Sequence, residues 1–312
     1  MTRGAALLAV TAAPALAGCG LGAGAEPTDT RLTVTDGYGA RPLQRFEAPK
    51  AGGEETVMRL LQRNAKVATR YGGGFVQSID GRAGGHAGGR PVDWFFYVNG
   101  VEAEKGAAAT RVRSGDRIWW DRHDWGSVQR VPAVVGSFPE PFLHGIDGRR
   151  LPVRVECAVP GLAACEEVQR RLTRYEIPAS LSRPRSVATK ETLRIVVGPW
   201  RAIAGDIGVA SLEQGPQRSG VFARPSPDGR RIALVDATGR TTRTLTARAG
   251  LVAATRAGDD PPLWVVTGTD DAGVASAAQA FDEGPLSDRF ALAIADGLGV
   301  ALPDRRAAAA RS

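Results

Sequence analysis

Residues 93–125 read DWFFYVNGVEAEKGAAATRVRSGDRIWWDRHDW, and this stretch decides the fold that the sequence predicts. It opens with a run of large β-forming side chains, Trp94 to Val98, which stops at Asn99-Gly100, a strong signal for a tight turn. A second β-rich run, Arg117 to Trp120, follows the turn pair Gly115-Asp116. Two strands of one sheet are therefore expected here.

Both faces of that sheet are expected to carry aromatic side chains, because strand side chains alternate between faces. The sequence divides them into opposed sets: Trp94, Phe96 and Val98 against Phe95 and Tyr97 in the first strand, and Ile118 and Trp120 against Trp119 in the second. One face must pack on the core of the domain. What covers the other face is the functional question that the sequence raises.

The composition is that of a globular protein. A length of 312 residues is enough for about two domains, and contents of 43% hydrophobic and 23% charged residues are ordinary. The formal net charge is +7, but the arginines are scattered, whereas a nucleic-acid-binding surface clusters its basic residues. We therefore expect no nucleic-acid partner.

The N-terminus is predicted to be a targeting segment. Arg3 precedes a short apolar run, Ala5 to Leu16, which is too short to span a bilayer as a permanent helix. The run ends in Leu16-Ala17-Gly18-Cys19, which resembles the bacterial lipobox, whose cysteine is lipidated after cleavage. Residues 1–18 are interpreted as a lipoprotein signal peptide and residues 19–29 as a flexible tether, with an ordinary secretion signal as the alternative. Lipid on Cys19 would hold the protein on the extracytoplasmic face of the cell membrane.

The other two cysteines are predicted to form a disulfide. Cys157 and Cys165 make an even pair in an exported protein, where the compartment is oxidising, and they flank a turn at Pro160-Gly161. The alternative is two free buried thiols.

Residues 30–131 are expected to form the first domain. Leu32 to Thr35 alternates like a strand, and Glu54-Glu55 opens an amphipathic helix that can cover one face of a small sheet. The glycine-rich segment Asp80 to Pro91 is expected to be an exposed loop.

Three phrases in this domain resemble the transcobalamin and intrinsic-factor C-terminal-like family: SIDG at 78–81, WFFYVNG at 94–100 and SGDRI at 114–118 before the Trp-rich strand. The resemblance covers about one third of the chain and implies a β-grasp-like fold, with one helix across a mixed sheet. It also implies cobalamin or another corrinoid as a candidate bound ligand, and we expect no other cofactor. The helical domain that supplies most of the grip in the vertebrate carriers has no counterpart in this sequence.

The predicted ligand-binding residues are the aromatic side chains around the second face and a histidine of the glycine-rich loop: Phe95, Tyr97, Trp119, Trp125 and His86. Such a face suits a flat, partly apolar ligand, and a glycan strand would stack on the same rings. The alternative is that the rings pack against the second domain or fill the small core. A lone histidine in a polar loop is, in the alternative, only solvated.

Asp121, His123 and Asp124 form a compact charged cluster near the end of the second aromatic strand. Three side chains supply too few ligands to make a cation site by themselves. The cluster is interpreted as a charged strand end, and no metal site is predicted.

The rest of the chain is predicted to be a proline-rich linker, residues 132–150, and an α/β domain with a mixed, helix-covered sheet, residues 151–303. Continuous apolar strands that alternate with helical segments favour this architecture. Phe290 to Ile294 is its expected last strand, and residues 304–312 are expected to be a disordered tail. The fold class is therefore α+β, with a β-grasp-like domain followed by an α/β domain.

No enzyme is predicted. The sequence holds no dinucleotide fingerprint, no Walker loop and no G-x-S-x-G elbow. His86, His123 and His144 all precede the second domain, which excludes a histidine-based triad built within it. We name no catalytic residue, and a carboxylate-dependent hydrolase is the least favoured alternative.

These observations predict an exported, lipid-anchored binding protein. Its aromatic face would capture a bulky ligand, for which a corrinoid is the candidate, and hand it to a transporter partner. The alternatives are a non-enzymatic scaffold protein of the cell surface, with the face buried on its own second domain, and a glycan-binding accessory protein.

Overall fold

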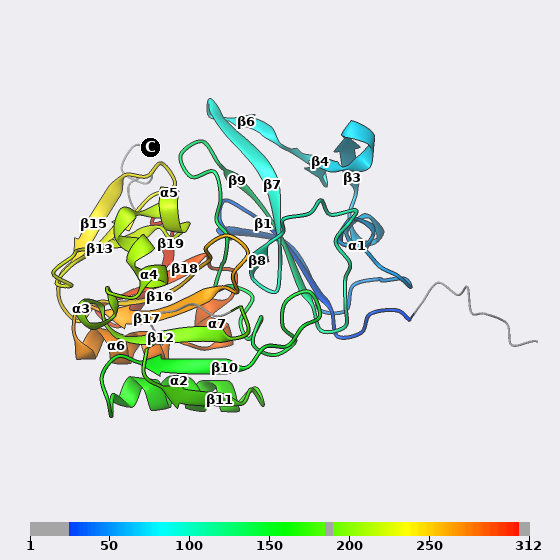
Figure 1. The fold of residues 1–312 in the computed structure, drawn as a ribbon. Helices are drawn as coiled ribbons and strands as arrows, with labels where there is room; N and C mark the ends of the chain where they lie inside the picture. The colour runs from blue at the N-terminus through cyan, green and yellow to red at the C-terminus, as the bar shows by residue number, and fades with distance from the viewer. Residues whose placement is uncertain (1–24, 185–189, 306–312) are drawn as a thin grey trace, which may run out of the picture.

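The computed structural model describes residues 25–184 and 190–305, which contain two large sheets side by side (Figure 1). We call the N-terminal sheet, with the elements that pack on it, the first domain and the C-terminal sheet, with its own elements, the second domain. Mixed sheets and short helices make this an α+β protein, as predicted. The predicted signal peptide and the lipidation residue Cys19 lie outside the described residues. Within the described ranges, no helix has the length and apolar character needed to cross a membrane.

The first domain is built on a six-stranded sheet with the order β2-β1-β9-β7-β6, in which β8 also pairs with β7. β1 runs parallel to β9, and the other pairings are antiparallel. The long strands β7 and β9 are the two that the aromatic stretch predicts. The strands are β1 (Arg31–Asp36), β2 (Arg41–Phe46), β6 (Gly85–Ala87), β7 (Arg90–Val98), β8 (Val101–Glu102) and β9 (Arg117–Asp124).

Helix α1 (Val57–Asn64) covers one face of this sheet. Thr56 is its N-cap, with a side-chain oxygen that accepts a hydrogen bond from a backbone amide of the first turn at 3.3 Å. The buried side of the helix, including Leu61, belongs to the same core cluster as Trp94 and Trp120. The predicted alternation of the aromatic residues between the two faces is therefore confirmed.

A small sheet with the order β3-β4-β5 lies at the outer end of the first domain. It consists of β3 (Val67–Arg70), the short 3-10 helix η1 (Tyr71–Gly73), β4 (Phe75–Ile79) and β5 (Arg82–Ala83). The exposed loop predicted for Asp80 to Pro91 is thus wrong in part, because that segment contains β5 and β6. Glycines at positive φ, Gly81 and then Gly88-Gly89, supply its two tight turns. Such short strands leave little apolar pattern in the sequence.

The second domain is built on a seven-stranded sheet with the order β11-β10-β12-β17-β16-β18-β19. The pairings from β11 to β17 are parallel, and those from β17 to β19 are antiparallel, so the predicted mixed sheet is present. Its strands are β10 (Val153–Cys157), β11 (Ala179–Ser182), β12 (Leu193–Pro199), β16 (Gly250–Thr255), β17 (Leu263–Gly268), β18 (Ala291–Ala295) and β19 (Leu298–Leu302).

Helices α2 (Ala163–Thr173) and α6 (Asp271–Gln279) pack on one face of this sheet, in a single core cluster with its strands. The opposite face meets a group of short elements and the first domain. Those elements are α3 (Trp200–Ile203), α4 (Ile207–Ala210), η2 (Ser211–Gln214), α5 (Pro216–Ser219), β13 (Ala223–Pro225), β14 (Ile232–Val235) and β15 (Thr241–Leu245), and α7 (Glu283–Leu286) precedes β18.

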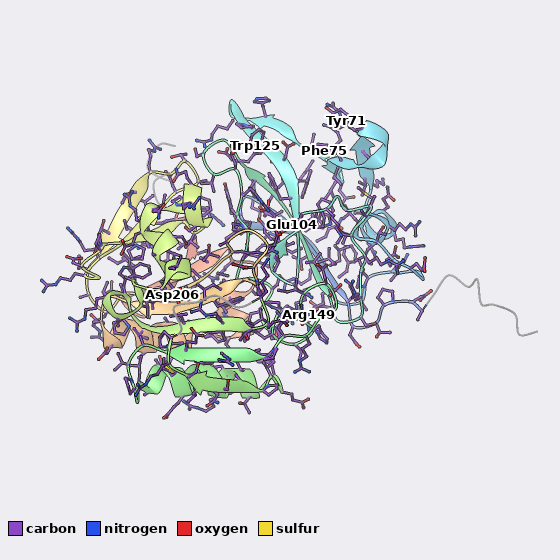
Figure 2. The ribbon with its side chains drawn as sticks, in the orientation of Figure 1. Tyr71, Phe75, Glu104, Trp125, Arg149 and Asp206 are labelled. Carbon is purple, nitrogen blue, oxygen red and sulfur yellow. A yellow bond between two sulfur atoms is a disulfide. The ribbon has the colours of Figure 1, made fainter. Side chains whose placement is uncertain are left out.

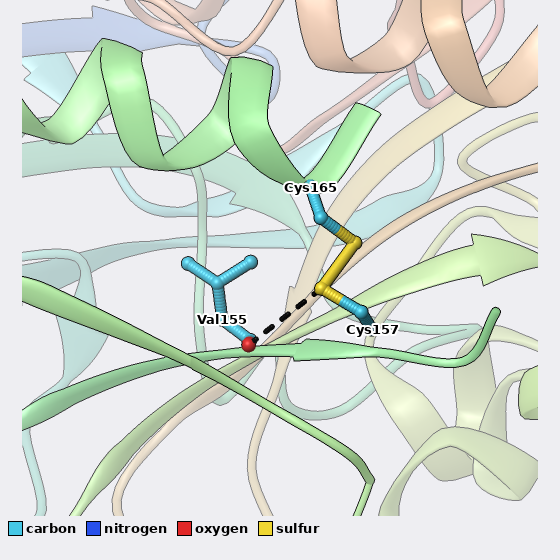
Figure 3. The surroundings of a disulfide bond; sticks show 3 residues. All are labelled: Val155, Cys157 and Cys165. Atoms are coloured by element: carbon cyan, nitrogen blue, oxygen red, sulfur yellow. Dashed lines mark hydrogen bonds between the residues drawn. A yellow bond between two sulfur atoms is a disulfide. The ribbon is translucent and has the colours of Figure 1, made fainter. Parts of the chain in front are cut away.

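Cys157 and Cys165 are joined in a disulfide, as the sequence predicts (Figure 3). Cys157 ends β10, and Cys165 lies in the first turn of α2. The bond therefore ties the first parallel strand of the sheet to the helix that follows it.

The end of the chain corrects two predictions. The strand around Phe290 to Ile294 is present as β18, but it is not the last, because a tight turn leads into the half-exposed edge strand β19. Asp304, placed in the disordered tail by the sequence, is only 3% exposed and accepts hydrogen bonds from Thr242 at 2.7 Å and Arg243 at 3.0 Å.

The predicted proline-rich linker, residues 132–150, packs tightly against the rest of the protein. Val135, Phe138 and Phe142 are fully buried in the core cluster that holds α2 and α6. Val134 donates a backbone hydrogen bond to Gly100 of the first domain at 2.9 Å. This segment therefore belongs to both domains.

Candidate functional site

The second aromatic face of the first domain is an interdomain interface. Tyr97 is 0% exposed and Trp119 is 3% exposed, and both share a core cluster with residues of the second domain. Phe290 of the second domain meets these two rings edge-on, at centroid distances of 5.6 Å and 5.2 Å. The open ligand surface that was predicted is therefore not found, because the second domain covers it.

The five predicted site residues do not form one surface. Phe95 is half-buried against the shared core. Trp125 is half-buried at the end of β9 (Figure 2), where its indole N–H donates to Asp93 at 2.8 Å. His86 is exposed in β6, away from the buried pair Tyr97 and Trp119.

The charged cluster at the end of β9 is a buried polar network. Asp121 is fully buried and accepts hydrogen bonds from four donors: Thr35 Oγ1, Tyr38 N, Gly39 N and His123 Nδ1. Burial by itself would raise the pKa of this carboxyl, but the hydrogen bonds and the adjacent imidazole outweigh burial and hold its pKa below the usual value. Asp121, in β9, therefore holds the β1–β2 turn in place through hydrogen bonds to its backbone.

His123 is enclosed between two aromatic rings. The ring of Tyr38 stacks on one side at 4.4 Å, and the ring of Phe95 stacks on the other at 4.3 Å. The Tyr38 hydroxyl donates a hydrogen bond to the backbone carbonyl of Asp124. The charged strand end that was predicted is thus an aromatic-walled core element, since its imidazole is only 4% exposed.

A cavity of about 570 Å³ opens beside this network, between the two domains. The β1–β2 turn, β6, β7 and the end of β9 line it from the first domain. The turn between β14 and β15 and the residues after β19 line it from the second domain. We call this cavity the interdomain cleft.

The lining of the interdomain cleft combines apolar side chains with polar ones, as the lining of a small-molecule site usually does. Its apolar lining residues are Tyr38, Ala40, Ala87, Val92, Ala237 and Pro303. Its charged lining residues, besides His123, are Asp36, Asp124, Asp236, Asp304, Arg41, Arg122, Arg240 and Arg305. The cleft can therefore hold an amphipathic molecule and orient it by its charged end.

A second cavity, of about 600 Å³, lies on the second domain near the start of β12 and β17. Arg194, which lines this second cavity, already forms ion pairs with Glu156 at 2.6 Å and with Asp206. We therefore favour the interdomain cleft as the candidate functional site.

Sequence reasoning missed most of the cleft. Tyr38 stands in the glycine-flanked turn at 37–39, and Ala237 and Arg240 belong to the turn between β14 and β15. Arg305 was assigned to the tail. The one available signal was the compact cluster of Asp121 with His123, which marks the wall of the cleft.

Comparisons with known proteins match part of the chain. Residues 54–124 match a family model described as "Domain of unknown function (DUF4430)". A crystal structure of a protein from Ruminococcus gnavus, described as a candidate metal-binding protein, is similar with a TM-score of 0.25 and 15% identity. That similarity covers 31% of this chain and 97% of the other. No curated protein matches the chain. Within the described residues, no group of three or more His, Cys, Asp or Glu side chains could hold a metal ion.

Proposed function

We propose that this chain is a non-enzymatic, lipid-anchored, extracytoplasmic binding protein that takes a small ligand in the interdomain cleft. The observation that carries the proposal is the cleft itself: about 570 Å³ between two domains, lined by both apolar and charged side chains. Ligand sites occur preferentially at domain interfaces of this kind.

We further propose that the first domain is a β-grasp unit of the transcobalamin C-terminal-like type. A single helix, α1, lies across one face of a mixed sheet whose neighbours β1 and β9 are parallel. The match of residues 54–124 to DUF4430 includes the WFFYVNG and SGDRI phrases that carry the resemblance.

A corrinoid is a weaker candidate for the ligand than the sequence suggested. Tyr97 and Trp119, on which a corrin ring would lie, are buried by the second domain. If a corrinoid binds, it does so at the mouth of the cleft. Transfer to a transporter partner would suit a protein that is tethered by lipid on Cys19 and binds its ligand between two domains.

A surface scaffold protein is the second candidate function. It is favoured by the shared core, in which the second domain buries the aromatic face as that alternative predicts. Tyr71 and Phe75 also project from the outer end of the first domain, at 85% and 36% exposed (Figure 2). The two rings are neighbours, with centroids 6.3 Å apart, and would suit contact with a protein or glycan partner.

Filling the cleft tests the proposed function. Ala237→Trp places an indole in the interdomain cleft, and Ala257→Trp fills the second cavity as its matched control. Thermal unfolding would be followed with cyanocobalamin, chitin oligosaccharides and small amphipathic acids. A rise in Tm that is lost only in Ala237→Trp supports the cleft. If no compound raises Tm, or if Ala237→Trp responds like the wild type, the scaffold function is favoured.

The anchor is tested separately. Cys19→Ser removes the lipidation residue, so the protein should move from the membrane fraction to the soluble extracytoplasmic fraction. Retention in the membrane fraction without Cys19 would contradict the lipid anchor.

A further inference from the structure

Arg305 lines the interdomain cleft and has no ion-pair partner among the described residues. It follows the buried Pro303-Asp304 pair and lines the cleft opposite the β1–β2 turn. Its guanidinium forms no hydrogen bond or ion pair with any residue that the structure describes, whereas most arginines around the cleft do.

The acidic residues of the cleft are already matched by other arginines. Three arginines, Arg41, Arg82 and Arg122, share Asp36, at 2.8, 3.3 and 3.4 Å. The three remaining aspartates have arginine partners of their own: Asp124 pairs with Arg90, Asp236 with Arg240 and Asp304 with Arg243. The lining itself balances four aspartates with four arginines. Arg82, Arg90 and Arg243, which lie outside the lining, also pair with these aspartates, so Arg305 adds to an excess of positive charge around the cleft.

Arg305 also has other cationic side chains near it. Partial burial, and then the repulsion of Arg41 and Arg289, lower the pKa of its guanidinium, although buried Asp121 attracts it. Asp121 cannot neutralise it by direct contact, because its oxygens are held by the four donors described above. A bound anion would relieve this repulsion.

We propose that the ligand of the interdomain cleft is an amphipathic oxyanion, with a carboxylate or phosphate held between Arg305 and Arg41. Its apolar body lies against Ala237, Val92 and Tyr38, which line the cleft. Arginine suits this role because its planar fork donates two parallel hydrogen bonds to a carboxylate or phosphate. The inference rests on the proposed function and adds the chemical class of the ligand.

A matched set of probes tests the charge requirement. Octanoate, octyl phosphate and 1-octanol share one apolar body and differ in the head group, and they would be titrated into the full chain by calorimetry. We expect at least one of the two anions to bind at least about tenfold more tightly than the alcohol, with an affinity that falls as sodium chloride is added. The stronger of the two distinguishes a carboxylate ligand from a phosphate ligand.

Charge reversal then locates the anion. Arg305→Glu should weaken anion binding by about tenfold or more, while Arg230→Glu, an exposed arginine on the β13–β14 hairpin, should leave it unchanged. An unchanged Tm for both variants in the absence of probe shows that the fold is intact.

The outcomes distinguish failure of the oxyanion inference from failure of the proposed ligand site. If octanol binds as tightly as both anions, or if Arg305→Glu binds like Arg230→Glu, the oxyanion inference is overturned. Absence of binding by both anions at millimolar concentration overturns it as well. If an anion binds equally well to Ala237→Trp, the proposed cleft itself is wrong, because the site then lies elsewhere.

Discussion

Gly39 lies so close to Asp288 that a Cβ on the glycine would be 1.9 Å from the Asp288 carbonyl oxygen. Gly39 belongs to the β1–β2 turn of the first domain, and Asp288 precedes β18 in the second. The same turn donates two backbone hydrogen bonds to the buried carboxylate of Asp121. At this turn the backbones of the two domains therefore lie so close that no side chain fits between them.

Gly39→Ala should loosen this contact. Gly39 has a φ of +75°, and Gly37 in the same turn has a φ of +78°, but a Cβ on Gly37 meets only Ala40 at 3.5 Å. Gly37→Ala should therefore cost about 1 kcal/mol, from backbone strain alone. Gly39→Ala should cost about 2 to 4 kcal/mol, because it adds a clash between the domains.

Urea unfolding of the two glycine variants measures this difference. Equal losses of stability would show that the domains do not press on each other at this turn. A loss confined to Gly39→Ala, with an earlier change in tryptophan fluorescence, would show that they do.

Two tyrosines of the interface should respond differently to loss of the hydroxyl. Tyr97 Oη is buried and has no hydrogen-bond partner among the described residues, whereas the Tyr38 hydroxyl donates to the carbonyl of Asp124. Tyr97→Phe should leave stability unchanged or raise it slightly, because it removes an unpaired buried polar group. Tyr38→Phe should cost about 1 kcal/mol. A loss in Tyr97→Phe as large as in Tyr38→Phe, in the same denaturation experiment, would reveal a bound water or another partner for Tyr97.

The sequence predicted the local pattern of the first domain well, because that pattern depends on alternation alone. The positions of Trp94 and Trp119 on opposite faces follow from strand geometry, and the structure confirms them. What covers Trp119 could not be predicted in the same way. Its cover is Phe290, 171 positions later in the sequence, and nothing local to either ring encodes their contact.

The interdomain cleft could not be predicted from the sequence for a related reason. Asp121 and His123, in its wall, form a charged cluster in the sequence, but spacing alone could not show that Tyr38 and Phe95 enclose the imidazole. Arg305 sits next to an alanine-rich stretch that reads as a tail, so its place in the cleft depends on the unpredicted pairing of β19. Edge strands of this kind carry a weak apolar pattern and are easily missed.

The disulfide should contribute measurably to the stability of the second domain. It closes a short loop between Cys157 and Cys165, eight positions apart, for which chain entropy gives about 2 to 3 kcal/mol. Replacing both cysteines by serine should lower the free energy of unfolding by about this amount. Dithiothreitol should destabilise the wild type to the same level and leave the double variant unchanged. A wild type that is insensitive to dithiothreitol under unfolding conditions would contradict a stabilising bond.

The Asp121–His123 pair should give the protein a pH dependence in the acid range. The pKa of Asp121 is depressed in the folded protein, so its ionised form contributes stability that is complete above its unfolded pKa of about 3.9. That contribution is lost as the pH falls below this value toward the folded pKa. Asp121→Asn should therefore be less stable than the wild type at pH 7, by about 3 kcal/mol, since His123 and Thr35 lose their charged partner.

The same substitution should flatten the acid limb of the stability curve. As the pH falls below about 3.9 and through the folded pKa of Asp121, the wild type loses the stability that Asp121 provides, and Asp121→Asn has none of it to lose. Asp228 is the matched control, because its pKa is also depressed, by hydrogen bonds from Ser226 and the Arg230 amide, but it is fully exposed. Asp228→Asn should keep the wild-type curve, since an exposed carboxylate is screened by water. Parallel curves for the wild type and Asp121→Asn, measured by urea unfolding at each pH, would show that the buried pair does not set the acid sensitivity of the interface.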